Sequence, residues 1–76
     1  MPSRPELDSE AAQRFFADQV RIRAARRGYT LYRLAQEAGI SEVTLHRLLG
    51  GERSPRLGQI CALARVLRCR PAALLP

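Results

Sequence analysis

The side chains best suited to contact a partner lie together in one short segment, residues 42–47. Arg47 can donate two hydrogen bonds to the edge of a guanine, and Glu42 can accept one from the amino group of a cytosine. Val43 can only pack against an apolar group such as the methyl group of thymine. Thr44 and His46 add a hydroxyl and an imidazole. These residue types predict contacts with the base edges of duplex DNA, provided that one surface presents them together.

The chain contains almost none of the residue patterns that enzymes use. Its single histidine, His46, has no partner at the spacing of a metal site or of a catalytic pair. There is no carboxylate pair, Ser/His/Asp set, Cys/His set or phosphate-binding glycine loop, and Gly50-Gly51 indicates a helix end. Cys61 and Cys69 are too few for a disulfide scaffold and lack metal-ligand partners. We therefore expect a cytoplasmic protein with reduced thiols that is not an enzyme and has no cofactor or metal.

The charge of the chain is distributed unevenly. All thirteen cationic side chains are arginines, and seven carboxylates leave a net charge of +6. Residues 1–18 have a balance of −2, whereas residues 19–76 carry eleven arginines against three glutamates, a balance of +8. A small basic body favours a polyanionic partner. We interpret the arginines of residues 21–27 mainly as a solvated helix face, with direct DNA contact as the alternative. No apolar run of about 18 residues occurs, so no membrane partner is expected.

The composition predicts an all-α fold. Alanine, leucine and arginine, all good helix formers, make up 35 of the 76 residues, and no alternating β-type stretch occurs. The length allows one domain with a small core. We predict a flexible leader over residues 1–8 and a single helix-turn-helix domain over residues 9–76. The expected helices are Ser9–Arg27, Leu31–Ala38, Glu42–Leu49, a fourth that is capped by Ser54, has Pro55 in its first turn and runs to Leu67, and a final turn, Ala72–Leu75.

Caps and apolar spacing support these boundaries. Thr30 and Ser41 are good N-caps, and Gly28 and Gly39 suit helix ends. The first helix is expected to bury Ala12, Phe16, Val20 and Ala24, which recur every four residues. The fourth is expected to bury Leu57, Ile60, Cys61, Ala64 and Leu67. Phe15 and Phe16 cannot both face one core, so one of them, or Tyr29, is expected at an interface.

The two short helices meet across Ala38-Gly39-Ile40-Ser41, a connection that sets them at a steep angle. In such a helix-turn-helix unit the first helix crosses the DNA backbone and the second lies in the major groove. Three leucines must point inward to hold the second helix: Leu45, Leu48 and Leu49. The remaining positions, residues 42–44, 46 and 47, are then left for DNA.

Residues 30–41 and 43–55 carry a Leu-Ala…Gly spacing and a Gly-x-x-x-Pro spacing in succession. Apolar residues at 63, 64 and 67 follow at the spacing of a fourth helix. In combination these segments resemble the helix-turn-helix of the phage repressor/Cro (XRE-like) family, over about residues 20–75. The resemblance implies a compact five-helix fold, similar to lambda repressor, with a central helix-turn-helix.

By position, the resemblance implies two sets of DNA contacts. Bases would be read by Glu42, Val43, His46 and Arg47. Phosphates would be contacted by Thr30, the amide of Leu31, Tyr32, Thr44, Arg53 and Arg56. Apart from the resemblance, we also expect Arg33 to lie near a phosphate. Two exposed helix N-termini, at Thr30 and Ser54, would present free amides to phosphates.

Three features depart from the family pattern. Leu31 replaces a residue that is usually polar, and Gly50 replaces the asparagine of a common Asn-Gly turn. Ala24 and Leu49 occupy positions where the family commonly buries an Arg–Glu pair. Losing both charges together leaves no charge stranded in the core, so the paired change supports the same packing.

Together these patterns predict a sequence-specific, double-stranded DNA-binding transcriptional regulator, a repressor that binds a palindromic operator as a homodimer. Two half-sites multiply the specificity of a unit that alone reads only a few base pairs. The apolar tail, residues 72–75, could supply the dimer contact or cap the core. The alternative is an antitoxin-type or other protein-interaction module that binds a partner protein through its N-terminal helix, with Phe15 or Phe16, and regulates its own operon. A non-specific nucleic-acid binder is a third hypothesis.

Overall fold

The computed structural model describes residues 9–76, and the leader expected over residues 1–8 lies outside the described residues. The described chain forms α1 (Glu10–Arg26), α2 (Leu31–Ala38), α3 (Glu42–Leu49), α4 (Leu57–Leu67) and a 3-10 turn, η1 (Pro71–Leu74). Residues 9–76 contain no strand, which confirms the all-α prediction. The expected count of five helices is corrected to four α-helices and one 3-10 turn over the same residues. Within this range no helix has the length and apolar character that a membrane span needs.

Local sequence explains where the first three helices begin and where the first two end. The hydroxyl oxygens of Ser9, Thr30 and Ser41 each accept a hydrogen bond from the amide three residues later, at 3.0–3.1 Å. Gly28 and Gly39 follow α1 and α2 with φ angles of 71° and 74°, a conformation that favours glycine. Consequently α2 and α3 have the predicted bounds, and α1 is one residue shorter at each end than predicted.

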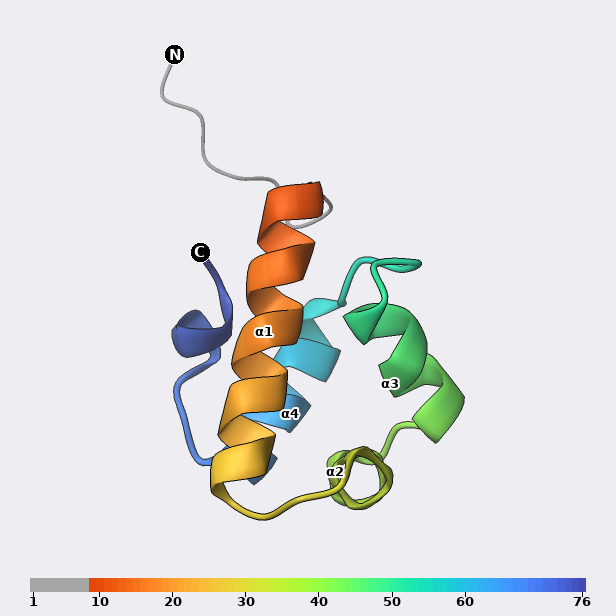
Figure 1. Ribbon diagram of the computed structural model, residues 1–76, viewed down its shortest axis with the longest axis vertical. Helices are drawn as coiled ribbons and strands as arrows, with labels where there is room; N and C mark the ends of the chain where they lie inside the picture. The colour runs from red at the N-terminus through yellow and green to blue at the C-terminus, as the bar shows by residue number, and fades with distance from the viewer. Residues whose placement is uncertain (1–8) are drawn as a thin grey trace.

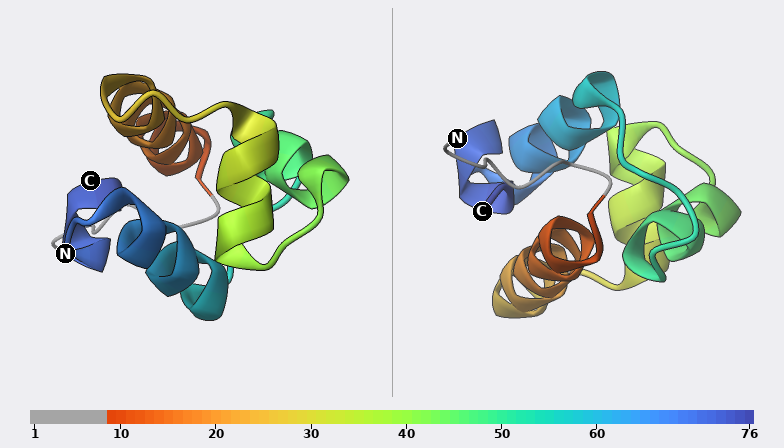
Figure 2. Two further views of the ribbon diagram at one scale, coloured as in Figure 1. Left: turned by 90° about the horizontal axis from the view of Figure 1, so that it is seen from below. Right: turned by 90° about the horizontal axis from the view of Figure 1, so that it is seen from above.

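The helices enclose one apolar core. α1 and α4 lie on one side of the molecule and α2 and α3 on the other (Figures 1 and 2). Large side chains that are at most 1% exposed come from every helix and from η1: Phe16, Val20, Leu34, Leu45, Leu48, Ile60, Leu63 and Leu74. Phe15 is 37% exposed, so only one of the two neighbouring phenylalanines faces the core, as predicted.

The fourth helix differs most from the sequence-based prediction. It begins at Leu57, with Arg56 as its N-cap residue, and the buried Pro55 belongs to the preceding loop. Leu57 is 68% exposed and Cys61 is also exposed, so including either in the inward set was wrong. Leu57 lies in the first turn, beyond the edge of the core, and Cys61 is rotated about 100° from its buried neighbour Ile60. The face that is buried comprises Ile60, Leu63, Ala64, Val66 and Leu67.

The C-terminal turn closes the core. It spans Pro71–Leu74, one residue earlier than predicted, and packs against α1 and α4. Leu74 is fully buried and Leu75 is half-buried. Of the two roles considered for this tail, capping the core is the one that the structure shows.

Candidate nucleic-acid interface

The turn between α2 and α3 sets the orientation of the two helices. Gly39 ends α2 in the left-handed conformation, and the amide of Ile40 then donates to the carbonyl of Ala35 at 3.0 Å. Leu34 of α2 and Leu45 of α3 are both fully buried, so both helices are held on the same core. The unit therefore presents the opposite face of α3 to solvent (Figure 1).

α3 brings the four predicted base-reading residues together. Glu42, Val43, His46 and Arg47 are all exposed, whereas Leu45 on the opposite face has no exposed surface. Val43, an apolar side chain, is 58% exposed. An exposed valine between charged neighbours contributes little hydrophobic stabilisation to the fold, but it can bury its methyl groups against a partner.

The polar side chains of this face differ in their internal contacts. Glu42 Oε2 lies 3.4 Å from Nε2 of His46, one helical turn later. The guanidinium of Arg47 makes no ion pair and no side-chain hydrogen bond with any residue from 9 to 76. Arg47 can therefore give both donors of one guanidinium edge to a partner, whereas Glu42 and His46 would divide their hydrogen bonds between each other and the partner.

Thr44 belongs partly to the N-terminal cap of α3. Its amide donates to Ser41 Oγ at 3.0 Å, and the Ser41 hydroxyl donates to Thr44 Oγ1 at 2.8 Å. The side chain of Thr44 is half-buried. Because its oxygen accepts in this bond, its own hydroxyl proton can still be donated to a phosphate.

The first turn of α2 carries four predicted phosphate contacts with different degrees of exposure. Thr30 Oγ1 accepts from the amide of Arg33 at 3.1 Å, which caps the helix. Leu31 is half-buried against the core, so only its amide remains for a phosphate. Tyr32 is 56% exposed, and its phenol oxygen accepts a hydrogen bond from Gln36 at 3.2 Å.

Arg33 is held by its own helix. Its Nε lies 2.7 Å from Glu37 Oε2, and its guanidinium lies 4.7 Å from the centre of the Tyr29 ring. The Tyr29 hydroxyl also donates to Glu37, at 3.3 Å. The hydrogen bond from Arg33 lowers the pKa of Glu37, and the same bond raises the pKa of Arg33 further. A phosphate would have to share this guanidinium with Glu37.

The loop between α3 and α4, residues 50–56, holds the last two predicted phosphate contacts. Arg53 and Arg56 are exposed, and neither forms an ion pair with another residue in the range 9–76. The helix N-terminus predicted at Ser54 lies at Arg56, so that prediction was wrong. The amide of Arg56 donates to Gln59 Oε1 at 2.9 Å. Since an arginine side chain cannot accept a hydrogen bond, no side chain caps the first amides of α4.

The contacts of two glutamines that lie near the expected phosphate-contacting residues were not predicted from the sequence. Gln13 of α1 donates from Nε2 to Ser54 Oγ at 3.1 Å, across 41 positions of sequence. No local pattern signals such a contact. Gln36 donates to Tyr32, and here the spacing of four residues on one helix could have indicated the pair.

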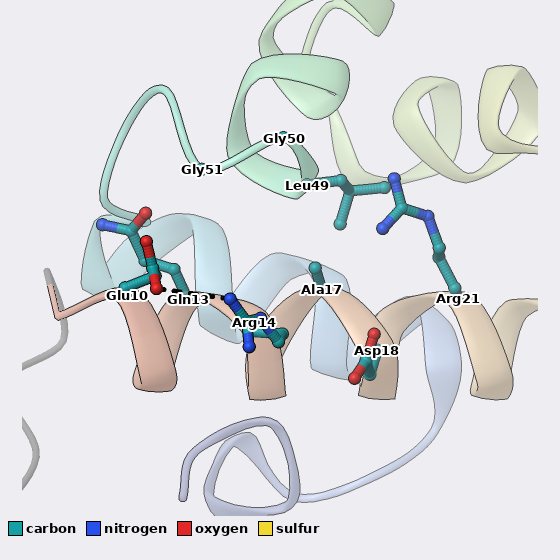
Figure 3. Close-up of a pocket in the computed structure, with 9 residues that line it drawn as sticks. All are labelled: Glu10, Gln13, Arg14, Ala17, Asp18, Arg21, Leu49, Gly50 and Gly51. Carbon is teal, nitrogen blue, oxygen red and sulfur yellow. Dashed lines mark hydrogen bonds and ion pairs between the residues drawn. The ribbon is translucent and has the colours of Figure 1, made fainter.

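A groove of about 480 Å³ lies between α1 and the end of α3. Figure 3 shows Arg14, Asp18 and Arg21 along its α1 side, with Gly50 and Gly51 opposite. Its charges are of both signs, and no group of three or more His, Cys, Asp or Glu that could hold a metal occurs over residues 9–76. The exposed face of α3 therefore remains the candidate site.

Comparison with known families identifies the helix-turn-helix region. Residues 19–75, three quarters of the chain, match the sequence model of the Cro/C1-type helix-turn-helix DNA-binding domain. A search of curated protein sequences gives no match.

Solved structures with a similar fold include two transcriptional regulators at about one-quarter identity. The P22 c2 repressor, in complex with a synthetic operator, superposes with a TM-score of 0.72 and 25% identity, over 79% of this chain and 91% of its own. An HTH_3-family transcriptional regulator from Vibrio cholerae gives a TM-score of 0.76 and 26% identity, over 84% of this chain and 36% of its own. A hypothetical transcription factor from Neisseria has a TM-score of 0.81 over 100% of this chain and 86% of its own. At 18% identity it shows the shared fold alone.

Proposed function

The chain belongs to the Cro/C1-type helix-turn-helix DNA-binding family and is a non-enzymatic DNA-binding regulator of transcription; from this premise we propose a repressor that reads a specific sequence in the major groove. The observation that carries the proposal is the exposed face of α3. It combines a donor pair on Arg47, an acceptor on Glu42 and an apolar contact on Val43. Each matches a different base edge, which is what sequence reading requires.

Phosphate contacts would surround this face and orient it. Thr30, Tyr32 and Thr44 each carry a hydroxyl at the start of α2 or α3. Arg53 and Arg56 add positive charge from the loop before α4. Such contacts hold the register of a protein on the duplex but carry little sequence information. Arg33 would be the weakest of them, because Glu37 already binds its guanidinium.

We further propose that the protein binds a palindromic operator as a homodimer in the cytoplasm. An eight-residue recognition helix reads only a few base pairs, and a second copy one helical turn of DNA away multiplies the specificity. The P22 c2 repressor, which shares 25% identity with this chain, is itself known in complex with an operator.

In vitro selection of bound duplexes from a random pool tests this proposal. We expect enrichment of a motif with two inverted half-sites whose centres are about 10 base pairs apart. A single unrepeated motif would support DNA reading and reject the dimer. Recovery of random sequence, with binding that depends only on salt, would indicate the non-specific binder instead.

A second candidate function, binding of a partner protein, is favoured by the outer face of α1. Phe15 and Ile22 are seven residues apart on that face, with exposures of 37% and 43%. The double substitution of both by alanine should leave operator affinity intact if this face of α1 takes no part in the dimer contact. In an antitoxin-type module the same change would release the partner, which pull-down from cells that express the wild-type and variant chains would detect.

A further inference from the structure

The first turns of α1 precede the region that matches the family. α1 begins at Glu10, whereas the match begins at residue 19. These turns are nevertheless firmly attached, because Ala12, Phe16 and Ala17 are at most 4% exposed. A rigid element outside the matched region therefore lies beside the loop that carries Arg53 and Arg56.

Gln13 connects this element to the loop at two points. Its Nε2 donates to Ser54 Oγ at 3.1 Å. Its Oε1 lies against Gly51, since a Cβ added to that glycine would be 3.2 Å from this oxygen. Figure 3 shows the amide of Gln13 turned from α1 toward the loop that follows Gly51. The side chain thus contacts the loop on both sides of Arg53.

The loop has few hydrogen bonds of its own. The amide of Gly51 donates to Leu48 at 3.4 Å and that of Glu52 to Arg47 at 3.0 Å. The amides of Arg53 and Ser54 donate to no backbone carbonyl within residues 9–76. The conformation of this stretch therefore depends on side-chain contacts such as the one from Gln13.

We propose that Gln13 is a positioning residue for DNA binding, which holds residues 51–54 so that Arg53 faces the phosphate backbone. The inference rests on the proposed function, because Gln13 would act on DNA only through the loop. It assigns a role in binding to a part of α1 that lies before the family match.

The first test uses the free protein. Gln13→Ala and Ser54→Ala each remove one partner of the same hydrogen bond, and Gln19→Ala is a matched control on the same helix. Hydrogen exchange of the amides of Gly51 and Glu52, which donate to Leu48 and Arg47, should become faster in the first two variants and stay unchanged in the control. Exchange in the core of α1 and α4 should stay the same in all three, which separates loop release from general unfolding.

The second test measures affinity for operator and random duplexes over a range of salt concentrations. Gln13→Ala and Ser54→Ala should each weaken binding about three- to ten-fold on every duplex, the effect of one side-chain hydrogen bond. The operator-to-random ratio should be unchanged, and the salt dependence should become shallower, as for Arg53→Ala. The double variant should bind no more weakly than Gln13→Ala alone, since the bond that Ser54→Ala removes is already lost in that variant.

Two results would overturn the inference while leaving the proposed function intact. One is loop exchange in Gln13→Ala equal to that of the Gln19→Ala control. The other is a loss of affinity with an unchanged salt dependence. Failure of the proposed function has a different signature, because the wild-type protein would then show no preference for any selected duplex. That result would remove the proposed function and the inference together.

Discussion

Arg47→Ala and Arg53→Ala should separate base reading from phosphate anchoring. Both arginines are exposed and without an ion-pair partner in the described part of the chain, so neither change should cost the fold more than about 0.5 kcal/mol. Any larger effect on DNA binding then reports the contact itself. Because Arg47 lies on α3 and Arg53 lies in the following loop, we expect the two variants to weaken binding in different patterns.

The expected magnitudes follow from the two kinds of contact. A bidentate arginine–guanine pair discriminates by about 1–3 kcal/mol. Arg47→Ala should therefore weaken operator binding by about 5- to 150-fold and relax the preference at one base pair of each half-site. Arg53→Ala should weaken operator and random duplexes equally and reduce the slope of log affinity against log salt by about 0.9 for each phosphate that the variant no longer neutralises.

Fluorescence anisotropy with a selected operator and its single-base variants measures both patterns. Arg65→Ala is the matched control, since Arg65 is an exposed arginine in the last turn of α4 and is not part of the helix-turn-helix. It should lower affinity only slightly, through the general positive field. If Arg47→Ala and Arg53→Ala gave the same profile across the base variants, the assignment of reading to α3 and anchoring to the loop would be refuted.

Three further predictions concern the helix cap, the packing and the ion pair that support the site. Ser41→Ala should lower stability by about 0.5–2 kcal/mol because α3 loses its cap, and an unchanged thermal midpoint would contradict this. Ala24→Arg should cost about 3–5 kcal/mol by burying an unpaired charge, and Leu49→Glu in the same chain should recover part of it. No recovery in denaturant unfolding would reject the shared packing of these positions. The Arg33 hydrogen bond lowers the pKa of Glu37 from its ordinary value of 4.5. The contribution of the Arg33–Glu37 interaction to stability is therefore complete above about pH 4.5. It is lost as the pH falls through the lower pKa that Glu37 has in the folded protein. The thermal midpoint of the wild type should fall more on acidification than that of Arg33→Ala, and parallel curves would contradict this.

Much of the helix-turn-helix could be predicted because its determinants are local. Thr30 and Ser41 cap the amide three residues later, and Gly39 supplies a backbone conformation that other residues adopt at a cost. These signals act within one helical turn, so no distant contact is needed to place them. They gave the bounds of α2 and α3 and the exposed face that presents Arg47.

The errors occurred where the deciding contacts are distant in sequence. Ser54-Pro55 has the local appearance of a helix start, but Pro55 is buried in the loop and α4 begins two residues later. The position of that start relative to the core leaves Leu57 exposed, although its residue type favours burial. The bond from Gln13 to Ser54 joins residues 41 positions apart and has no sequence pattern at all.

The sequence by itself therefore determined the all-α class, the two helices of the DNA-binding unit and the residue types on the face of α3. Periodicity and capping involve residues that are close together in the sequence, so they can be recognised without knowing the tertiary structure. Only the tertiary structure decided which side of α4 is buried, that the tail caps the core, and that Glu37 binds Arg33 while Arg47 forms no ion pair within residues 9–76. Those outcomes depend on which helix surfaces contact each other. Because the core is closely packed, the arrangement of the helices depends on all of its side chains together.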